Sequence, residues 1–552
     1  MTVRRVMGSE TEYGIASRGG QWENHAQLSY DVIAAARKLN PGTAHIRWDY
    51  GHESPTHDAR GFHTERAHVR SDLLTDIPQL QVTNVPHVNG GRVYVDHAHP
   101  EYSSPEVMSP REVITFDRAG DAEMREYAQT VSSQGRPITL YRNNTDGKGA
   151  SWGSHENYQI RRGVPFDILS TIFTAHAVSR QIYTGTGRVG IGVTSEIPGF
   201  QLSQRADFFT MKVGLQTTFD RPIVNTRDEP HSTDAYRRFH VIVGDANRMD
   251  VPQFLKFGTT SLIFWALETS IERGLNVDDV VQSCSILDPV SALHAVSHDT
   301  SLHQSFELEN GEKLTAFQLQ LRLRSWVYAV AAEIYDTDIH GNPLWPDQDT
   351  KDTVMMWTDV LKDAAQISQA SDDERLELTQ PASRIEWFAK WQIMEKMRRR
   401  KGMTWNDAVL KAMDISWAQL DSSSLFDKVS HRTQHIVTSS EIAAATHNPP
   451  ESTRAYVRGQ LLKNYPDYVL AASWDRIALS RSKITADTNQ KSEENEDGLS
   501  QREGSHDDFS HCNPLIIEMY DPRSYSACAL ESSFMQTHTI EEVVSRILSL
   551  QK

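Results

Sequence analysis

Alternating apolar and polar residues predict short strands in the part of the chain before residue 250. In GRVYVDHAHPEY, which begins at Gly91, Val93 and Val95 alternate with Tyr94 and Asp96. Successive side chains of a strand point to opposite faces, so Tyr94 and Asp96 are expected on one face and the valines on the other. Further extended segments are predicted at 8–14, 187–193, 199–209, 221–229 and 237–245.

Helical periodicity begins near residue 109 and dominates from 252 to 415. Ser109, Pro110 and Glu112 have the order of an N-cap, a first helical residue and the third residue of a capping box. A helix with a broad apolar face is predicted from Pro165. Strand segments followed by helical segments predict an α+β domain with a mainly antiparallel sheet, not alternating βαβ units.

A second, smaller unit is predicted at the C-terminal end, which divides the chain into domains at 1–430 and 431–552. The segment 484–510 is polar and charged, and it lacks the apolar surface needed to offset the entropy of ordering. We therefore expect a disordered acidic insertion there. A strand is predicted from Pro514, and Thr539 is expected to cap a final amphipathic helix that carries Val543 and Ile547.

Composition favours a cytoplasmic enzyme. A chain of 552 residues with 38% hydrophobic residues is long enough to bury a large core. The net charge of -17 argues against a nucleic-acid partner, and no run approaches the roughly 20 apolar residues of a membrane span. The first residues lack the apolar stretch of a signal peptide. Three widely spaced cysteines do not suggest a disulfide framework, which favours a reducing compartment.

Carboxylates occur where a core strand would carry apolar residues. Glu10 and Glu12 are two residues apart, so they share a strand face, as Tyr94 and Asp96 do. Two acidic strand faces are costly to bury unless a cation or a positively charged network lies between them. Glu10, Glu12 and Glu101 offer the oxygen ligands that Mg²⁺ uses together with substrate phosphates. A solvated position remains the alternative for any single glutamate.

Several basic and imidazole side chains are candidates for the same site. His155 shares its predicted strand face with Asn157, whereas a lone strand histidine such as His240 is more often structural. Arg205 and Arg227 lie in or beside strands, where a guanidinium can bind phosphate or carboxylate through two hydrogen bonds. An ion pair with an acidic side chain is the alternative for each arginine.

Asp96 is the preferred catalytic candidate. The chain has no GxxxxGK[ST] loop for phosphate and no GxSxG motif for a serine nucleophile. Asp96 lies beside the predicted metal ligands, where its carboxylate would either attack a carbonyl or deprotonate water. The sequence does not separate these two roles.

Several motifs together resemble one known family. They are MGSETEYGI, GRVYVDHAHPEYSSPEV, NNTDGKGASWGSHENY, GFQLSQRADF, VNTRDEPH, RRFHVIVGDAN, NPPESTRAYVRG and AASWD. In this order, from Met7 to about Asp475, they are similar to the family of Pup–protein ligases and Pup deamidases/depupylases, which is related in fold to glutamine synthetase and glutamate–cysteine ligase. The resemblance implies a glutamine synthetase-like domain with a curved, mainly antiparallel sheet cradle flanked by helices, plus a small C-terminal domain.

Within this family, three features resemble the hydrolase more than the ligase. RWDYGHESPTHDARGF, from Arg47, is similar to the start of an active-site loop of the depupylases, here spanning about 41–80. DHAHPEY and GKGASWGSHENY are also similar to the depupylase forms. The loop departs from the family pattern after Phe62.

The resemblance also implies roles for individual residues. The implied metal ligands are Glu10, Tyr94, Glu101, His155 and His240, and the implied catalytic residue is Asp96. The implied nucleotide-binding residues are Gly8, Ser9, Glu12, Arg92, Ser103, Ser104, Asn157 and Trp474. Arg205, Arg227 and Arg458 are the expected contacts to substrate or phosphate.

The implied cofactors are Mg²⁺ and ATP, or ADP with phosphate, and the implied partners are the small modifier Pup and pupylated proteins. The expected reaction cleaves the isopeptide bond between Pup and a target lysine, or deamidates the C-terminal glutamine of Pup. Two alternatives remain: an ATP-consuming carboxylate–amine ligase such as a Pup–protein ligase, and a non-catalytic Pup-binding relative. The presence of Asp96, Glu10 and Glu101 together counts against the second alternative.

Overall fold

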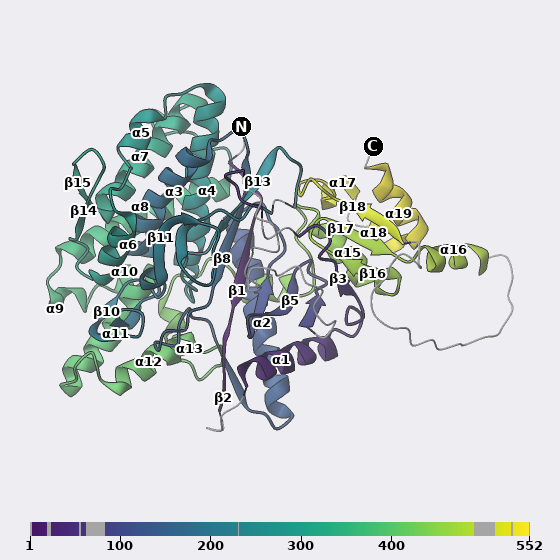
Figure 1. Cartoon of the computed structure of the whole chain (residues 1–552), viewed down its shortest axis with the longest axis horizontal. Helices are drawn as coiled ribbons and strands as arrows, with labels where there is room; N and C mark the ends of the chain where they lie inside the picture. Colours follow the sequence, from purple (N-terminus) through teal and green to yellow (C-terminus); the bar gives the residue numbers. More distant parts are fainter. Residues whose placement is uncertain are drawn as a thin grey trace.

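A six-stranded antiparallel sheet lies at the centre of the computed structural model (Figure 1). The structure describes residues 3–18, 24–53, 57–61, 83–229, 231–490, 514–530 and 534–550. In the order β13–β8–β1–β6–β5–β4, the strands are Tyr236–Val241, Ser154–Arg161, Met7–Glu12, His99–Ser103, Arg92–Asp96 and Asn84–Pro86. Both acidic segments therefore form strands, and these strands belong to one sheet.

The register of this sheet places polar residues in rows across neighbouring strands. Glu10 of β1 is paired with His155 of β8. Glu101 of β6 is paired with Glu12 of β1 on one side and with Tyr94 of β5 on the other. Directly opposite residues of paired strands share a face, so these five side chains all project from the same face of the sheet.

Helices cover the opposite face of the sheet (Figure 1). Those that pack against this sheet are α1 His25–Leu39, α2 Pro110–Ser133, α3 Phe166–Thr184 and α4 Asp250–Arg273. Outside them, α7 Ala316–Ile334 and α8 Gln348–Gln369 pack against α4, and α11 Glu386–Lys401 packs against α3. The ring of Phe264 in α4 lies 5.4 Å from Tyr158 of β8 and 5.1 Å from Phe239 of β13. Val93 and Val95 of β5 are buried in a cluster with residues of α1, as their alternation predicts. These observations confirm the α+β class and the antiparallel sheet.

The start of α2 differs from the prediction in one detail. Ser109 is the N-cap and accepts a hydrogen bond from the backbone N–H of Glu112, and Pro110 begins the helix. The Glu112 carboxylate, however, accepts from the backbone N–H of Met108 and from the hydroxyl of Ser452. A contact with the C-terminal part of the chain therefore replaces the second half of the capping box.

The extended segment predicted at 199–209 is interrupted. It contains the end of β10 (Ile197–Gln201), a short 3₁₀ helix (Ala206–Phe208) and the start of β11 (Phe209–Gly214). The Ser203 hydroxyl donates to the Asp245 carboxylate, and it accepts from the backbone N–H groups of Arg205 and Ala206. Such a side-chain hydrogen bond favours a turn over a continuous strand. The neighbouring strands β9 and β12 are Arg188–Ile191 and Arg221–Asn225.

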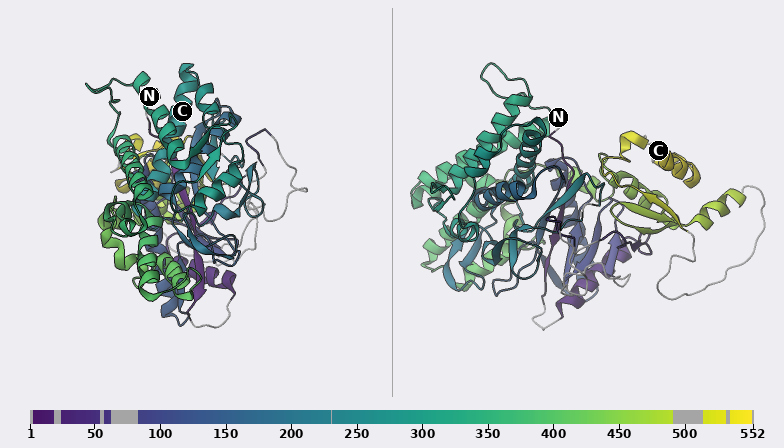
Figure 2. Two further views of the ribbon diagram at one scale, coloured as in Figure 1. Left: turned by 90° about the vertical axis from the view of Figure 1, so that its left-hand side faces the viewer. Right: turned by 45° about the horizontal axis from the view of Figure 1, so that its top comes forward.

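The C-terminal part of the chain has its own sheet and its own apolar cluster, and it forms a separate lobe in Figure 2. In the order β18–β17–β16–β3, its strands are Leu515–Glu518, Arg476–Leu479, Val469–Ala472 and Arg47–Trp48. An N-terminal segment thus completes the C-terminal sheet. Val437 and Ala445 belong to the large apolar core, whereas the second cluster consists of Ile46 and of residues from Tyr456 onward.

The segment 484–510 is described only in part. Helix α16 spans Arg481–Gln490, and Ile484 packs against the C-terminal apolar cluster. Residues 491–510 lie outside the described residues. The final helix α19, Ile540–Ser549, is confirmed, with Thr539 as its N-cap and a complete capping box with Glu542.

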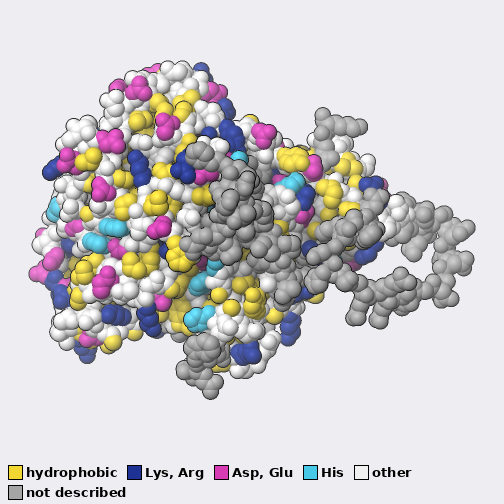
Figure 3. Space-filling model, in the orientation of Figure 1, with side chains coloured by type: hydrophobic (Ala, Val, Ile, Leu, Met, Phe, Trp, Pro, Cys, Tyr) yellow, Lys and Arg dark blue, Asp and Glu magenta, His cyan; other side chains and the backbone are white. Residues whose placement is uncertain are grey.

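Within the described ranges, we find no helix that is long and apolar enough to cross a bilayer. On the face shown in Figure 3, acidic and basic side chains are interspersed among apolar ones. The net charge of -17 is therefore not gathered into one acidic patch on the described part of that face.

Candidate functional site

A cavity of about 460 Å³ lies over the polar face of the central sheet. The predicted residues that line it are Glu10, Glu12, Arg92, Tyr94, Asp96, Glu101, Ser103, His155, Arg205, Arg227, His240 and Trp474. An adjoining cavity of about 110 Å³ is lined by Gly8, Ser9, Ser104 and Asn157, and it shares Glu10, Ser103 and Trp474 with the larger one. Residues predicted from distant parts of the sequence thus meet in two connected cavities.

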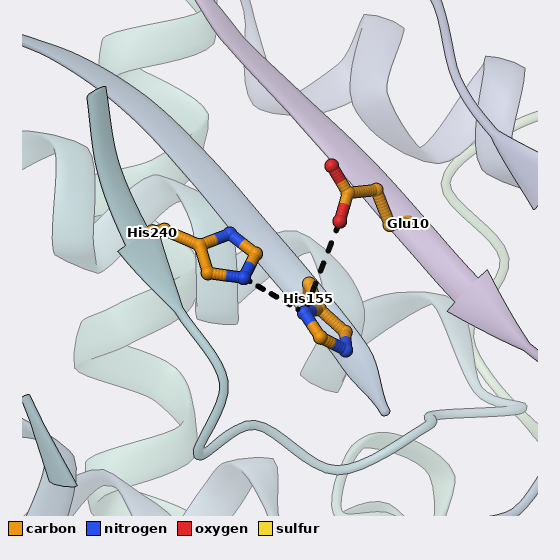
Figure 4. Close-up of side chains that lie close together, drawn as sticks. All are labelled: Glu10, His155 and His240. Carbon is orange, nitrogen blue, oxygen red and sulfur yellow. Dashed lines mark hydrogen bonds and ion pairs between the residues drawn. The ribbon is translucent and has the colours of Figure 1, made fainter. Parts of the chain in front are cut away.

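The first cluster of candidate metal ligands consists of Glu10, His155 and His240 (Figure 4). Nδ1 of His155 lies 3.0 Å from Nε2 of His240 and 3.8 Å from a carboxylate oxygen of Glu10. Burial lowers the pKa of both imidazoles, and the nearby charge of Arg238 adds to this effect at His240. Both rings are therefore neutral near pH 7, which is the form that binds a metal ion.

The second cluster consists of Glu12, Asp96 and Glu101, whose carboxylate oxygens lie within 4.8 Å of one another. Burial raises the pKa of Glu101 well above its usual range, and the negative charges of Asp96 and Glu12 raise it further. A cation would remove this repulsion, and three carboxylates form an oxygen ligand set that suits Mg²⁺. The donors in this part of the cavity therefore fit the expected metal ion.

Asp96 lies at the end of β5, beside a two-residue turn. The turn residues His97 and Ala98 have φ values of 42° and 74°, in the left-handed region that residues other than glycine rarely adopt. Nδ1 of His97 lies 2.7 Å from the Asp96 carboxylate. Burial by itself would raise the pKa of Asp96, but the His97 hydrogen bond and the charge of Arg227 lower it. Asp96 is therefore ionised at neutral pH.

Arg238 is a member of the site that our reasoning from sequence did not identify. Its guanidinium donates to a carboxylate oxygen of Glu10 at 2.9 Å and to the side-chain oxygen of Asn157 at 2.7 Å. Nδ1 of His240 lies 3.0 Å from the same Asn157 oxygen. Arg238 stands two residues before His240 in β13, so the period of two along a strand puts both side chains on the same face.

Two further residues of the larger cavity come from the segment that begins the predicted loop at 41–80. Tyr50 and Glu53 both line the cavity, and the indole N–H of Trp48 donates to Glu53 at 3.1 Å. Burial raises the pKa of Glu53 to about 7, although the charge of Arg92 opposes this effect. Most of the remaining loop, residues 54–56 and 62–80, lies outside the described residues.

Arginines supply the positive charge of the larger cavity. The guanidinium of Arg92 lies 4.4 Å from the ring of Trp48 and 3.8 Å from the ring of Tyr94. Burial lowers the pKa of Arg205, and its Nε has no hydrogen-bond partner among the described residues. Arg221, which the sequence did not indicate, also lines the cavity, where it donates to the backbone oxygens of Thr217 and Ser151.

The smaller cavity has an apolar and a polar part. Ser104 accepts a hydrogen bond from the backbone N–H of Ser9 at 2.9 Å, and Trp474 forms part of the wall. The hydroxyl of Ser9 donates to Asp117 instead. Only the main chain of Ser9 is therefore placed to contact a molecule in the cavity.

Arg458 lines neither cavity. Its side chain is 1% exposed, it is ion-paired with Glu106, and it donates to the backbone oxygen of Trp474 at 2.6 Å. Arg454 immediately precedes helix α15 (Ala455–Asn464), four residues before Arg458, and it also donates to Glu106, at 2.7 Å. The structure thus places Arg458 in a buried ionic contact that supports Trp474, away from the positions expected for substrate or phosphate.

The motifs that line these cavities match one family model. A model described as Pup-ligase protein matches residues 5–478. The chain belongs to this family. The depupylase of Acidothermus cellulolyticus is 40% identical over 86% of this chain and 91% of that protein. The Pup deamidase/depupylase of Mycobacterium tuberculosis is 38% identical over the same shares of the two chains. A Pup–protein ligase of Bifidobacterium longum is 34% identical over 70% of this chain and 78% of that protein.

Solved structures of this family have the same fold. The Pup ligase PafA in complex with Pup matches with a TM-score of 0.71 at 23% identity, over 100% of this chain and 96% of that one. PafA in complex with ADP matches with a TM-score of 0.64 at 23% identity, over 89% of this chain and 96% of that one. The α+β architecture described above is thus that of the Pup-ligase family.

Proposed function

We propose that this protein is an ATP- and Mg²⁺-dependent depupylase that also deamidates the C-terminal glutamine of Pup. The observation that carries the proposal is the identity of 40% and 38% to two hydrolases of the family over 86% of the chain, against 34% to a ligase over 70%. Both reactions add water across a side-chain amide. One releases the amino group of a target lysine, and the other releases ammonia.

The proposed nucleotide site uses both cavities. The apolar wall of the smaller cavity, which includes Trp474, suits a nucleobase, since base–aromatic stacking stabilises such contacts. The larger cavity suits the phosphates, because Arg92 and Arg205 offer buried guanidinium groups there. The strand face between them would form the sheet cradle of a glutamine synthetase-like domain.

The metal site is proposed on the two clusters of candidate ligands and the adjoining Tyr94. Glu10, Glu101 and Tyr94 would hold Mg²⁺ together with the phosphates, and His155 and His240 are positioned as further ligands. When bound, Mg²⁺ and the nucleotide would supply positive charge and phosphate oxygens that polarise the scissile carbonyl. Arg238 and Asn157 orient the Glu10 carboxylate through hydrogen bonds of 2.9 and 3.2 Å.

Asp96 is proposed as the catalytic residue. Its carboxylate belongs to the second ligand cluster and is kept ionised by the hydrogen bond with His97 and the charge of Arg227. As a nucleophile it would displace the amine and then be released by water; as a general base it would take a proton from the attacking water. Both routes end with the carboxylate of Pup and a free amine.

The domain organisation follows from this site. We propose a catalytic unit in the first part of the chain and a small C-terminal unit that contributes Trp474 to the nucleotide cavity. The segment from Trp48 to Glu53 would be the fixed end of an active-site loop, because Tyr50 and Glu53 line the larger cavity. A cytoplasmic location would agree with the intracellular substrate that the proposal requires.

The test is an assay of the purified protein with a Pup conjugate, Mg²⁺ and ATP. The expected result is release of the free target without ADP formed in proportion. Conjugate formation from Pup ending in glutamate, with one ATP consumed for each product, would instead establish the second candidate, a Pup–protein ligase. That candidate is kept because the 34% identical relative is a ligase and the matching solved structures are ligases.

A further inference from the structure

Strand β1 has a second polar face, which points away from the proposed metal site. Glu10 and Glu12 project into the cavity, whereas the alternate residues Ser9 and Thr11 project toward helix α2. Ser9 is 3% exposed and Thr11 is 1% exposed, so neither hydroxyl is available to a ligand. The residues of this second face therefore make contacts inside the protein, with helix α2.

The partner of both hydroxyls is Asp117 of α2. One carboxylate oxygen of Asp117 accepts from Ser9 at 3.3 Å and from Thr11 at 3.2 Å. The other oxygen accepts from Arg142 at 2.7 Å and from Gln253 at 3.3 Å. Asp117 is 0% exposed, and both of its oxygens have partners.

The same arrangement is repeated one helical turn later. Tyr13, the next residue of the series after Ser9 and Thr11, donates to Asp121 at 2.9 Å. Arg142 joins the two carboxylates of α2, because one of its terminal nitrogens donates to Asp117 and the other to Asp121 at 2.8 Å. Three alternate residues of the N-terminal chain are thus hydrogen-bonded to two aspartates four residues apart.

Buried polar contacts lie behind β1 and behind the adjacent β8, whereas the packing behind β5, two strands away, is apolar. Behind β8, Tyr158 packs against the ring of Phe264 and donates to Glu156, which is buried and ion-paired with Arg180, whereas behind β5 the buried side chains are Val93 and Val95. Apolar packing would bury the reverse face of β1 at lower cost, since burying ionised groups requires compensation by other charges. A directional hydrogen-bonded contact instead fixes the register and rotation of the strand. A shift of one residue would turn both glutamates into the core.

We propose that Asp117 is a positioning residue for the metal site, which it serves by holding β1 so that Glu10 and Glu12 face the cavity. The inference rests on the proposed function, because it assumes that these glutamates take part in binding a metal ion. Asp117 itself touches neither cavity. Its effect is transmitted through the hydroxyls of Ser9 and Thr11.

The test compares Thr11→Val with Thr11→Ser. Valine has the shape of threonine without the hydroxyl, whereas serine keeps the hydrogen bond to Asp117. The readout is the binding of Mn²⁺, a paramagnetic substitute for Mg²⁺, measured by electron paramagnetic resonance in the presence of ADP and without substrate. Loss of groups that orient metal ligands typically weakens metal binding by 10- to 100-fold. We expect the Mn²⁺ dissociation constant to rise about tenfold in Thr11→Val and to stay within about twofold in Thr11→Ser.

Two further variants complete the experiment. Asp117→Leu, which removes both acceptor oxygens from a side chain of similar reach, should weaken Mn²⁺ binding at least as much as Thr11→Val. Thr259→Val removes another buried hydroxyl, one that donates to Leu255 within α4, and should leave Mn²⁺ binding unchanged. If the wild-type protein binds Mn²⁺ and Thr11→Val binds it equally well, the positioning role is wrong and the proposed function stands. Failure of the wild-type protein to bind Mn²⁺ with ADP would overturn both.

Discussion

Replacement of Glu106 by glutamine tests how helix α15 and the residue before it are held against the end of strand β6. Glu106 follows strand β6, and its carboxylate accepts from Arg454 at 2.7 Å and from Nη1 of Arg458 at 3.1 Å. All three side chains are largely buried: Glu106 is 12% exposed, Arg454 is 4% exposed and Arg458 is 1% exposed. The glutamine variant keeps the shape of the side chain and removes its charge, so two buried arginines lose their anion.

The magnitude follows from the pKa of Glu106. Burial by itself would raise this pKa, but the charges of Arg458 and Arg454 lower it from 4.5 to about 2. A pKa difference of about 2.5 corresponds to about 3 kcal/mol of folding free energy. Because the folded pKa is the lower one, this stabilisation is present above pH 4.5 and is lost as the pH falls toward 2. We expect Glu106→Gln to lower the free energy of unfolding by about 3 kcal/mol at pH 7.

Glu441→Gln is the matched control. The hydrogen bonds from Arg111 and Thr438 also lower the pKa of Glu441 to about 2, but its side chain is 38% exposed and that of Arg111 is 42% exposed. Water screens this ion pair, so its loss should cost less than about 1 kcal/mol. Urea unfolding of both variants at pH 7, followed by circular dichroism, measures the difference. If Glu106→Gln is no more destabilised than Glu441→Gln, burial does not strengthen this contact and the reasoning is refuted.

Three further outcomes test the proposed site. Asp96→Asn should abolish cleavage of a Pup conjugate while ADP binding, measured by calorimetry, stays within about threefold of wild type; full cleavage would remove the catalytic assignment. Mg²⁺ binding near neutral pH should release protons and should tighten as the pH rises, because burial and the charge of Asp96 raise the pKa of Glu101 in the free site. Calorimetry in buffers of different ionisation enthalpy measures this release, and its absence would contradict the assignment of Glu101. Trp474→Ala should weaken nucleotide binding by about tenfold, and Trp474→Phe should largely restore it; equal affinities in a fluorescence titration would place the base elsewhere.

Local patterns account for most of the elements that were predicted correctly. The alternation in β5 placed Val93 and Val95 in the core and Tyr94 on the polar face, because a strand has a fixed period of two. The N-caps at Ser109 and Thr539 were also predicted, since a cap depends on residues three positions apart. The continuous strand predicted at 199–209 was wrong because Asp245, distant in sequence, accepts a hydrogen bond from the Ser203 hydroxyl and favours a turn there.

The sequence by itself determined the chemical inventory of this protein: which strands carry carboxylates, which helices are amphipathic, and which family the motifs resemble. Only the tertiary structure decided which of these groups meet. It brought Glu12, Asp96 and Glu101 into one cluster and Glu10, His155 and His240 into another. It also moved Arg458 from an expected ligand contact to a buried ion pair with Glu106. The physical reason is that strand pairing and helix packing join residues hundreds of positions apart, whereas a local pattern fixes only the face on which each side chain lies.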